Sequence, residues 1–250
     1  MNSAMAIEQS DLRLAQRLAN EAGALLLALQ REGALSGKAL GQAGDRRANA
    51  LIMRELRAAR RSDAILCEEE KDDKARLAHR RVWIIDPLDG TREYSEGRSD
   101  WAVHIALAID GIAAVGVVAL PSLGLTLTSG NPPKLKAANI PPKILVSRTR
   151  PAAEALLLAK TIGAELVPMG SAGAKAMAVV RGEADIYLHT GGQYEWDNCA
   201  PVAVAQAAGL YCARLDGSPM RYNREDSYLP DLLICRPELV DAVKAAIAAR

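Results

Sequence analysis

The chain has 250 residues, 50% of them hydrophobic and 24% charged, which is typical of a soluble globular protein with one or two domains. Its 31 Lys and Arg nearly balance 30 Asp and Glu, so the net charge of +1 gives no reason to expect a nucleic acid polymer or a membrane as partner. The N-terminus lacks a secretion signal and the four cysteines form no CxxC pair, so we expect a cytoplasmic protein with reduced thiols.

The first half of the chain carries helical and then strand patterns. Apolar residues recur at helical spacing before residue 61, and Asp110-Gly111 interrupts an apolar stretch as a hairpin turn does. In chain order we predict helices over 11–30 and 46–60, strands over 65–67 and 81–85, a hairpin over 101–120 and a strand over 123–128. The local connections between these strands favour an antiparallel or mixed sheet, so this half is expected to be α+β.

The second half alternates strands with helices. Pro-containing breaks at 129–133 and 140–142 precede it, and we place a domain boundary there, giving domains 1–133 and 134–250. Beyond the boundary we predict strands over 143–147, 164–168, 184–188 and 232–235, and helices over 152–161, 172–180, 198–208 and 237–249. This alternation is typical of a layered α/β unit.

Two carboxylates follow the predicted strand around Trp83. Asp86 and Asp89 lie three residues apart across a Pro-kinked turn, with the Leu88 carbonyl between them. Such a cluster of hard oxygen donors suits Mg²⁺. Gly90-Thr91 then offers backbone amides to an anionic oxygen. The segment therefore indicates a site for a metal and a phosphate, with a simple acidic surface turn as the alternative.

Other acidic residues are candidates for the same site. Glu68 directly follows the predicted strand 65–67, ahead of Glu69 and Glu70, whereas a run of charges is more often a solvated face. Asp197 stands at the head of a predicted helix, where it is either the N-cap or a further metal ligand. Residues alone leave both alternatives open.

Together these motifs resemble a known family. Glu68-Glu69, the DPLDGT run at 86–91 and Trp196-Asp197 are similar, in order and spacing, to the motifs of the Mg²⁺-dependent, lithium-sensitive phosphatases of the inositol monophosphatase superfamily. The resemblance spans nearly the whole chain. Thr91-Arg92-Glu93-Tyr94 and the tail 215–223 look like the CysQ-like 3′(2′),5′-bisphosphate nucleotidases, in their actinobacterial form. The resemblance implies a five-layer α-β-α-β-α sandwich with the site between the domains.

The resemblance also implies two Mg²⁺ ions and their ligands. Glu68, Asp86 and the Leu88 carbonyl would hold the first ion, and Asp86, Asp89 and Asp197 the second. A pair of cations can activate a water molecule and stabilise the leaving oxygen of a phosphate ester.

Further catalytic roles are implied for the turn and for the preceding helix. Thr91 would orient the attacking water, while the amides of Gly90 and Thr91 would bind phosphate oxygens. The family commonly has a Thr shortly before Asp45, and Gln42 stands there instead. Asp45 is therefore expected to steer the water, to hold a third Mg²⁺ or merely to cap the helix at 46–60.

Cations near the site are candidates for binding the rest of the substrate. Two of the segments that carry them follow strands of the second half, where open α/β sheets form ligand crevices, although most Arg and Lys are solvated surface. The predicted substrate contacts are Gly90, Thr91, Arg92, Ser147, Arg148, Ser171, Lys175 and His189, with Arg98 and Arg150 as further candidates.

We therefore expect a Mg²⁺-dependent phosphomonoesterase acting on a small phosphate ester. The resemblance implies that it removes the 3′-phosphate of adenosine 3′,5′-bisphosphate (PAP), and also of its sulfate-bearing analogue PAPS, near sulfate assimilation. Inositol 1-phosphate and fructose 1,6-bisphosphate are alternative substrates. A phospho-ligand-binding regulator without turnover is the alternative from another class, and a homodimer is left open.

Overall fold

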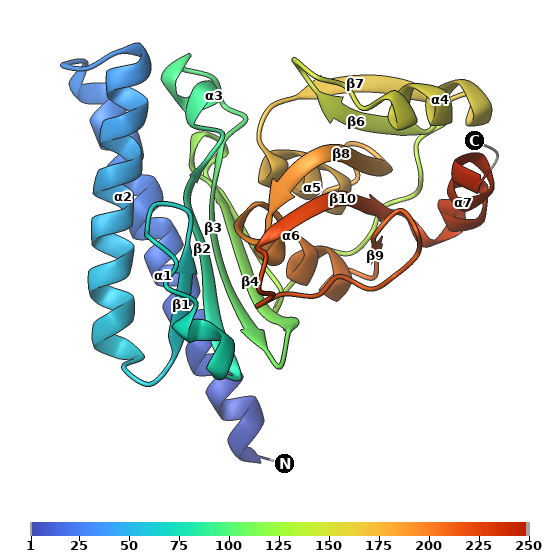
Figure 1. Cartoon of the computed structure of the whole chain (residues 1–250). Coiled ribbons are helices and arrows are strands. Elements are labelled where there is room, and N and C mark those ends of the chain that lie inside the picture. Colours follow the sequence, from blue (N-terminus) through green and yellow to red (C-terminus); the bar gives the residue numbers. More distant parts are fainter. Residues whose placement is uncertain (1, 249–250) are drawn as a thin grey trace.

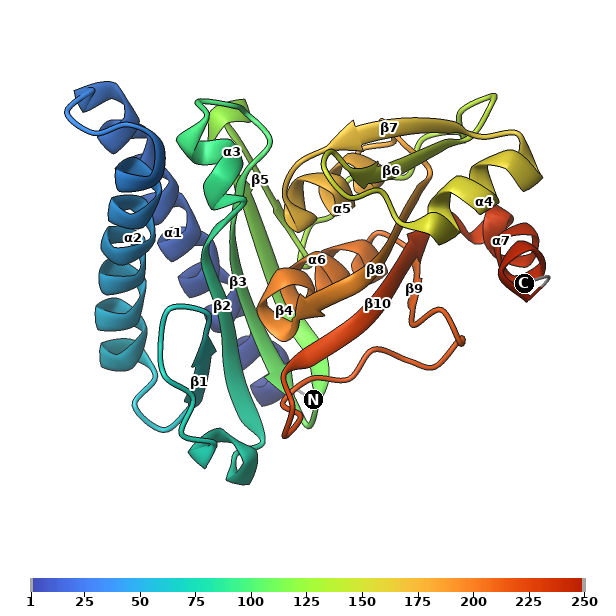
Figure 2. The same ribbon diagram turned by 45° about the horizontal axis from the view of Figure 1, so that its top comes forward.

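A computed structural model describes residues 2–248, with side chains from residue 9 onward. Its helices are α1 (Asn2–Glu32), α2 (Gly37–Ala59), α3 (Thr91–Ser95), α4 (Ala153–Ile162), α5 (Ala172–Val180), α6 (Glu195–Ala207) and α7 (Val240–Ala248). Its strands are β1 (Ala64–Cys67), β2 (Arg81–Asp89), β3 (Ala102–Ile109), β4 (Ile112–Leu120), β5 (Leu125–Thr128), β6 (Lys143–Ser147), β7 (Glu165–Met169), β8 (Ile186–Tyr194), β9 (Tyr211–Ala213) and β10 (Tyr228–Cys235). These elements stack in layers (Figures 1 and 2).

The first sheet has the strand order β1-β2-β3-β4-β5. β1 and β2 are parallel and the remaining pairs are antiparallel, so the predicted mixed sheet is confirmed. The β3–β4 hairpin turns at Asp110 and Gly111, whose φ angles of 50° and 77° are the positive values that a tight two-residue turn requires.

The second sheet has the order β7-β6-β8-β10-β9. β7, β6 and β8 are parallel, while β10 runs antiparallel to β8 and to β9. Helices connect the parallel strands, as the alternating pattern of the second half predicts.

Three apolar cores fill the spaces between five layers, and one of them lies on both sides of the middle layer. α1 and α2 cover one face of the first sheet, α5 and α6 lie between the two sheets, and α4 and α7 cover the outer face of the second sheet (Figure 1). Along β2, Trp83 and Ile85 face α1 and α2, whereas Val82 and Ile84 face the middle layer. A strand buried on both faces is apolar throughout, which explains this hydrophobic run. The predicted five-layer sandwich is confirmed.

Several elements differ from the sequence prediction. α2 begins at Gly37 rather than at 46, and α6 begins at Glu195 rather than at 198. β2 continues through Pro87 to Asp89. The pairing with β3 is irregular between Asp86 and Asp89, so Pro87 does not have to donate a regular ladder hydrogen bond. β9 was not predicted. The helix expected over 237–249 is a 3₁₀ turn followed by α7, and its residue 249 lies outside the described residues.

The expected domain boundary falls in the segment between β5 and β6, and it stays a prediction. α5 and α6, which come from the second half, pack on the first sheet as well as on the second. None of the helices that the structure describes combines the length and apolar character needed to cross a membrane.

Gly116 on β4 generates a test of how the middle layer packs. A Cβ atom there would lie 2.5 Å from the Ala200 carbonyl oxygen and 2.6 Å from the Ala203 Cβ, both on α6. Gly116→Val should therefore lower the free energy of unfolding by about 3 kcal/mol, measured by urea denaturation. Ala114 lines an open cavity, so Ala114→Val should change it by less than about 0.5 kcal/mol. Equal midpoints for the two variants would contradict this packing.

Candidate active site

Two buried carboxylates and a partly buried one meet where the first sheet joins the middle layer. Asp86 and Asp89 end β2, and Asp197 lies in the first turn of α6. One oxygen from each lies within 4.8 Å of the others. The Leu88 N–H donates to Asp86 Oδ1 at 3.0 Å and so shapes the turn between the two aspartates. The fold thus brings together the acidic residues that the motifs predicted.

Asp197 is the third residue of its helix and not its N-cap. β8 and α6 are longer than predicted, so Tyr194 occupies the N-cap position. The Tyr194 N–H donates to Asp197 Oδ2 at 2.6 Å, which fixes the carboxylate against the start of the helix. Burial, followed by the nearby Asp89, raises the pKa of Asp197 to about 6. Asp197 therefore supports its helix and also reaches the carboxylate cluster.

Asp89 is held by the N-terminus of α5. The Ser171 hydroxyl donates to its Oδ2, the Gly173 N–H donates to Oδ2 at 2.6 Å, and the Ala172 N–H donates to Oδ1 at 3.1 Å. Ser171 also caps α5 as predicted, since its Oγ accepts the Ala174 N–H. These donors bind a negative charge where a helix begins.

His104 is a further residue of the site, which no sequence motif indicated, and it is fully buried on β3. Its Nε2 lies 3.2 Å from Asp89 Oδ2, although the N–H is not aligned for a hydrogen bond. Its Nδ1 lies 3.1 Å from the Trp196 carbonyl oxygen. Burial raises the pKa of Asp89, but His104 and the hydrogen bonds outweigh it and lower the pKa to about 2. Burial alone would lower the pKa of His104, but the neighbouring Asp89 carboxylate outweighs this effect and raises the pKa above its ordinary value.

The acidic run after β1 separates into different roles. Burial is the main cause that raises the pKa of Glu68 to about 7, and Asp86 is its hydrogen-bonding neighbour. Glu70 points elsewhere, because its carboxylate accepts from Arg57 at 2.9 Å and from Asn49 at 3.2 Å. Glu68 therefore joins the carboxylate cluster, whereas Glu70 does not.

Asp45 lies inside α2, so the interpretation as a helix N-cap is wrong. Its Oδ1 lies 3.2 Å from Thr91 Oγ1, which is also 3.1 Å from the Leu88 carbonyl oxygen. Burial, followed by the charge of Glu69, raises the pKa of Asp45 to about 6. Gly90, with φ 86°, precedes Thr91 at the start of α3. This contact places Asp45 beside Thr91, the residue that is expected to orient the attacking water.

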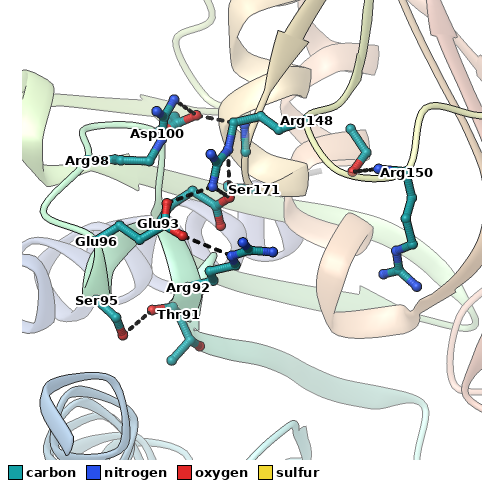
Figure 3. Close-up of polar contacts among 12 residues, drawn as sticks. Thr91, Arg92, Glu93, Ser95, Glu96, Arg98, Asp100, Arg148, Arg150 and Ser171 are labelled. Atoms are coloured by element: carbon teal, nitrogen blue, oxygen red, sulfur yellow. Dashed lines mark hydrogen bonds and ion pairs between the residues drawn. The ribbon is translucent and has the colours of Figure 1, made fainter. Parts of the chain in front are cut away.

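A cavity of about 470 Å³ lies beside the carboxylates, between α3, the end of β6 and the start of α5 (Figure 3). The predicted contacts Arg92, Ser147, Arg148, Ser171 and Lys175 all line it, together with Glu93, Thr149, Arg150 and Gly170. His189 is not among its lining residues. The cavity therefore unites five of the predicted substrate contacts in one place.

Glu93 on α3 and Glu96 directly after it bind two of the arginines of this cavity. Arg148 donates to Glu93 Oε1 at 2.8 and 3.1 Å and to Glu96 Oε2 at 2.9 Å, and Arg92 pairs with Glu96 at 2.9 Å (Figure 3). Arg150 points away from this network (Figure 3). Among the described residues, no carboxylate pairs with its guanidinium. Arg150 is therefore the arginine most available to an anion.

Two other candidates are bound by the protein itself. Lys175 is 5% exposed, and its Nζ donates to the carbonyl oxygens of Ser171 and Gly170. Burial lowers the pKa of Lys175 to about 8. His189 Nε2 lies 3.3 Å from the Gly192 carbonyl oxygen, and burial, followed by Lys175, lowers the pKa of His189. Arg98 pairs with Asp100 at 2.6 Å and does not extend into the cavity (Figure 3).

The donor set fits a divalent cation. Burial and the neighbouring Glu68 and Asp89 carboxylates raise the pKa of Asp86 well above its ordinary range. A cation would relieve this repulsion, and oxygen donors without clustered His or Cys suit Mg²⁺.

The model of the inositol monophosphatase family matches residues 6–246. The chain belongs to this family. It is 51% identical over 243 residues to the 3′-phosphoadenosine 5′-phosphate phosphatase of Mycobacterium tuberculosis, covering 91% of this chain and 90% of the relative. The enzyme of that name from Mycobacterium leprae is 48% identical, with 96% and 94% covered. The predicted family is confirmed.

Solved structures of the inositol monophosphatase family have the same fold. The crystal structure of CysQ from Bacteroides thetaiotaomicron has a TM-score of 0.77 and 24% identity, covering 91% of this chain and 97% of that one. At this identity the likeness supports the five-layer architecture alone.

The raised pKa values of Glu68 and Asp197 make the stability of the metal-free protein depend on pH. Their ordinary values are 4.5 and 3.8, and burial raises them to about 7 and about 6. At pH values between the ordinary and the raised pKa of each group, the folded protein binds more protons than the unfolded chain. Its free energy of unfolding therefore falls as pH rises.

We therefore expect the melting temperature in a chelator to be higher at about pH 5 than at about pH 7.5. Mg²⁺ should raise it most at the higher pH, because ionised carboxylates bind the cation. Thermal unfolding with and without Mg²⁺ measures both effects. A metal-free melting temperature that increases toward pH 7.5 would contradict the raised pKa values of Glu68 and Asp197.

Proposed function

We propose that the protein is a Mg²⁺-dependent phosphomonoesterase that hydrolyses the 3′-phosphate of PAP to give AMP and phosphate. The observation that carries the proposal is the convergence of Asp86, Asp89 and Asp197 from two distant elements. The names of the mycobacterial relatives agree with the predicted phosphatase activity and with PAP as substrate. The complete set of acidic residues argues against a regulator without turnover.

Two Mg²⁺ ions fit the carboxylates. Glu68, Asp86 and the Leu88 carbonyl would hold one ion. Asp86, Asp89 and Asp197 would hold the second, so Asp86 would contribute to both sites. When bound, the ions supply a water of lowered pKa and neutralise the charge on the leaving oxygen. A third ion at Asp45 stays a prediction.

Thr91 and Asp45 act on the attacking water. The Thr91 hydroxyl can donate its proton to Asp45 Oδ1, at 3.2 Å, and accept a hydrogen bond from the water. Asp45, with a pKa near 6, then receives the proton. The Gly90 and Thr91 amides bind the phosphate oxygens.

Variants of the acidic residues test the metal site. Asp86→Asn, Asp89→Asn, Asp197→Asn and Glu68→Gln should each lower turnover at least about a hundredfold, because each removes a metal ligand. Glu70→Gln should change it little, since Glu70 binds Arg57 and Asn49 instead. Release of inorganic phosphate from PAP, with and without Mg²⁺, measures the effect. Full activity after chelation would exclude this mechanism, and an equal loss for Glu70→Gln would exclude the assignment of Glu68.

The cavity supports a bisphosphorylated substrate. Its cations Arg92, Arg148, Arg150 and Lys175 outnumber its single carboxylate Glu93, so an anion is favoured there. Arg150 can bind the substrate without breaking an ion pair, whereas Arg148 must first give up its ion pairs with Glu93 and Glu96. Inositol 1-phosphate and fructose 1,6-bisphosphate remain the alternatives, and only the second of them carries another phosphate.

Two arginine variants separate these substrates. Arg150→Ala should raise KM for PAP about tenfold and leave KM for inositol 1-phosphate unchanged, because the lost charge-assisted contact is made to one substrate only. Arg148→Ala should have a smaller effect on PAP. Steady-state kinetics with both substrates measure the difference. Equal losses on both substrates would mean that Arg150 supports the fold or the scissile phosphate.

We further propose a cytoplasmic location. The four cysteines are free in the described structure, in keeping with reducing surroundings. A homodimer stays a prediction, which analytical ultracentrifugation can test.

A further inference from the structure

His104 touches the elements that supply two of the three clustered carboxylates. It lies on β3, is fully buried, and its ring packs against the backbone of α5. A Cβ atom at Gly173 would lie 2.0 Å from His104 Nε2, so only glycine allows this approach. The ring is therefore confined between the first sheet and the middle layer.

One ring nitrogen faces Asp89. Oδ2 of that carboxylate receives the Ser171 hydroxyl and the Gly173 N–H, and His104 Nε2 lies 3.2 Å from the same oxygen. From the residues that the structure describes, Oδ1 receives only the Ala172 N–H. Three groups crowd Oδ2 and one binds Oδ1, so the rotation of the carboxylate is fixed and a lone pair of Oδ1 stays available.

The other ring nitrogen faces the residue before Asp197. Nδ1 lies 3.1 Å from the Trp196 carbonyl oxygen, and because a carbonyl only accepts, Nδ1 is the donor. This contact holds the first turn of α6. Asp197 is fixed within that turn by its own bond to the Tyr194 N–H. The ring thus spans the gap between Asp89 and the start of the helix that carries Asp197.

We propose that His104 is a positioning residue that sets the spacing of Asp89 and Asp197 for a shared metal ion. The inference rests on the proposed metal site and deepens it. His104 does not bind the metal itself. An apolar side chain of similar size would fill the space, but it would have no polar atom to contact Asp89 or the Trp196 carbonyl oxygen.

Three substitutions separate this role from simple packing. His104→Leu keeps most of the volume and removes both polar contacts. His104→Asn places a donor near the position of Nδ1, and His104→Gln places one near the position of Nε2. Val118→Ala is the matched control, because Val118 is the buried cross-strand partner of His104 and its side chain has no polar group.

The experiment measures Mn²⁺ binding without substrate, by electron paramagnetic resonance, together with the melting temperature. His104→Leu should weaken Mn²⁺ binding about 10- to 100-fold. His104→Asn and His104→Gln should each recover part of the loss. Val118→Ala should lower the melting temperature and leave the dissociation constant within about twofold of the unsubstituted protein.

Several results would overturn the inference. If His104→Leu binds Mn²⁺ as tightly as the unsubstituted protein, the positioning role is excluded. It is also excluded if Val118→Ala lowers the melting temperature equally and weakens Mn²⁺ binding to the same extent. If His104→Leu does not fold, binding by His104→Asn and His104→Gln decides, and unchanged affinity in both excludes the role. Failure of the unsubstituted protein to bind Mn²⁺ would instead refute the proposed function itself, so the two failures are distinguishable.

Discussion

The structure depends on the burial of one negative charge, that of Asp89. A buried carboxylate is tolerated only when donors surround it, and the start of α5 supplies a hydroxyl and two backbone amides. This contact joins the end of β2 to the middle layer. Because Asp89 is also a member of the carboxylate cluster, the same atoms hold the layers together and shape the candidate metal site.

The same corner collects further contacts between the two halves of the chain. Asp100 accepts the Gly170 N–H at 2.7 Å, and Glu93 packs so closely on Gly170 that a Cβ there would lie 2.2 Å from its Cγ. Arg148 then closes the group by binding Glu93. Acidic groups come from the first half and most cations from the second, so the cavity has two chemically different walls.

The acidic motifs could be predicted from sequence because turns that follow buried strands leave local patterns, and the five-layer order was implied by the family resemblance that these motifs carry. The start of α2 could not be predicted. Gly41 and Gly44 disfavour a helix locally, yet they are needed where Thr91, Ser95 and Leu88 approach within 3.0 Å of a hypothetical Cβ. Tertiary packing therefore overrides propensity, and Asp45 lies inside the helix.

Other features depend on contacts between residues far apart in the chain. His104 is a single polar residue in an apolar strand, a pattern that is more often only a satisfied core histidine. The pairing of Arg148 with Glu93 joins residues 55 positions apart, which no local pattern records. β9, with three residues, is too short for a periodic signal.

The division of the metal ligands between distant parts of the chain has a consequence for biosynthesis. A nascent chain that has left the ribosome only as far as β5 contains Asp86 and Asp89 but not Asp197 or the amides of α5. Asp89 then lacks the donors at the start of α5, and both carboxylates lack their third partner. The candidate ligands come together only after α5 and α6 have docked, so a cation that needs all of them would bind late and would mark the finished fold.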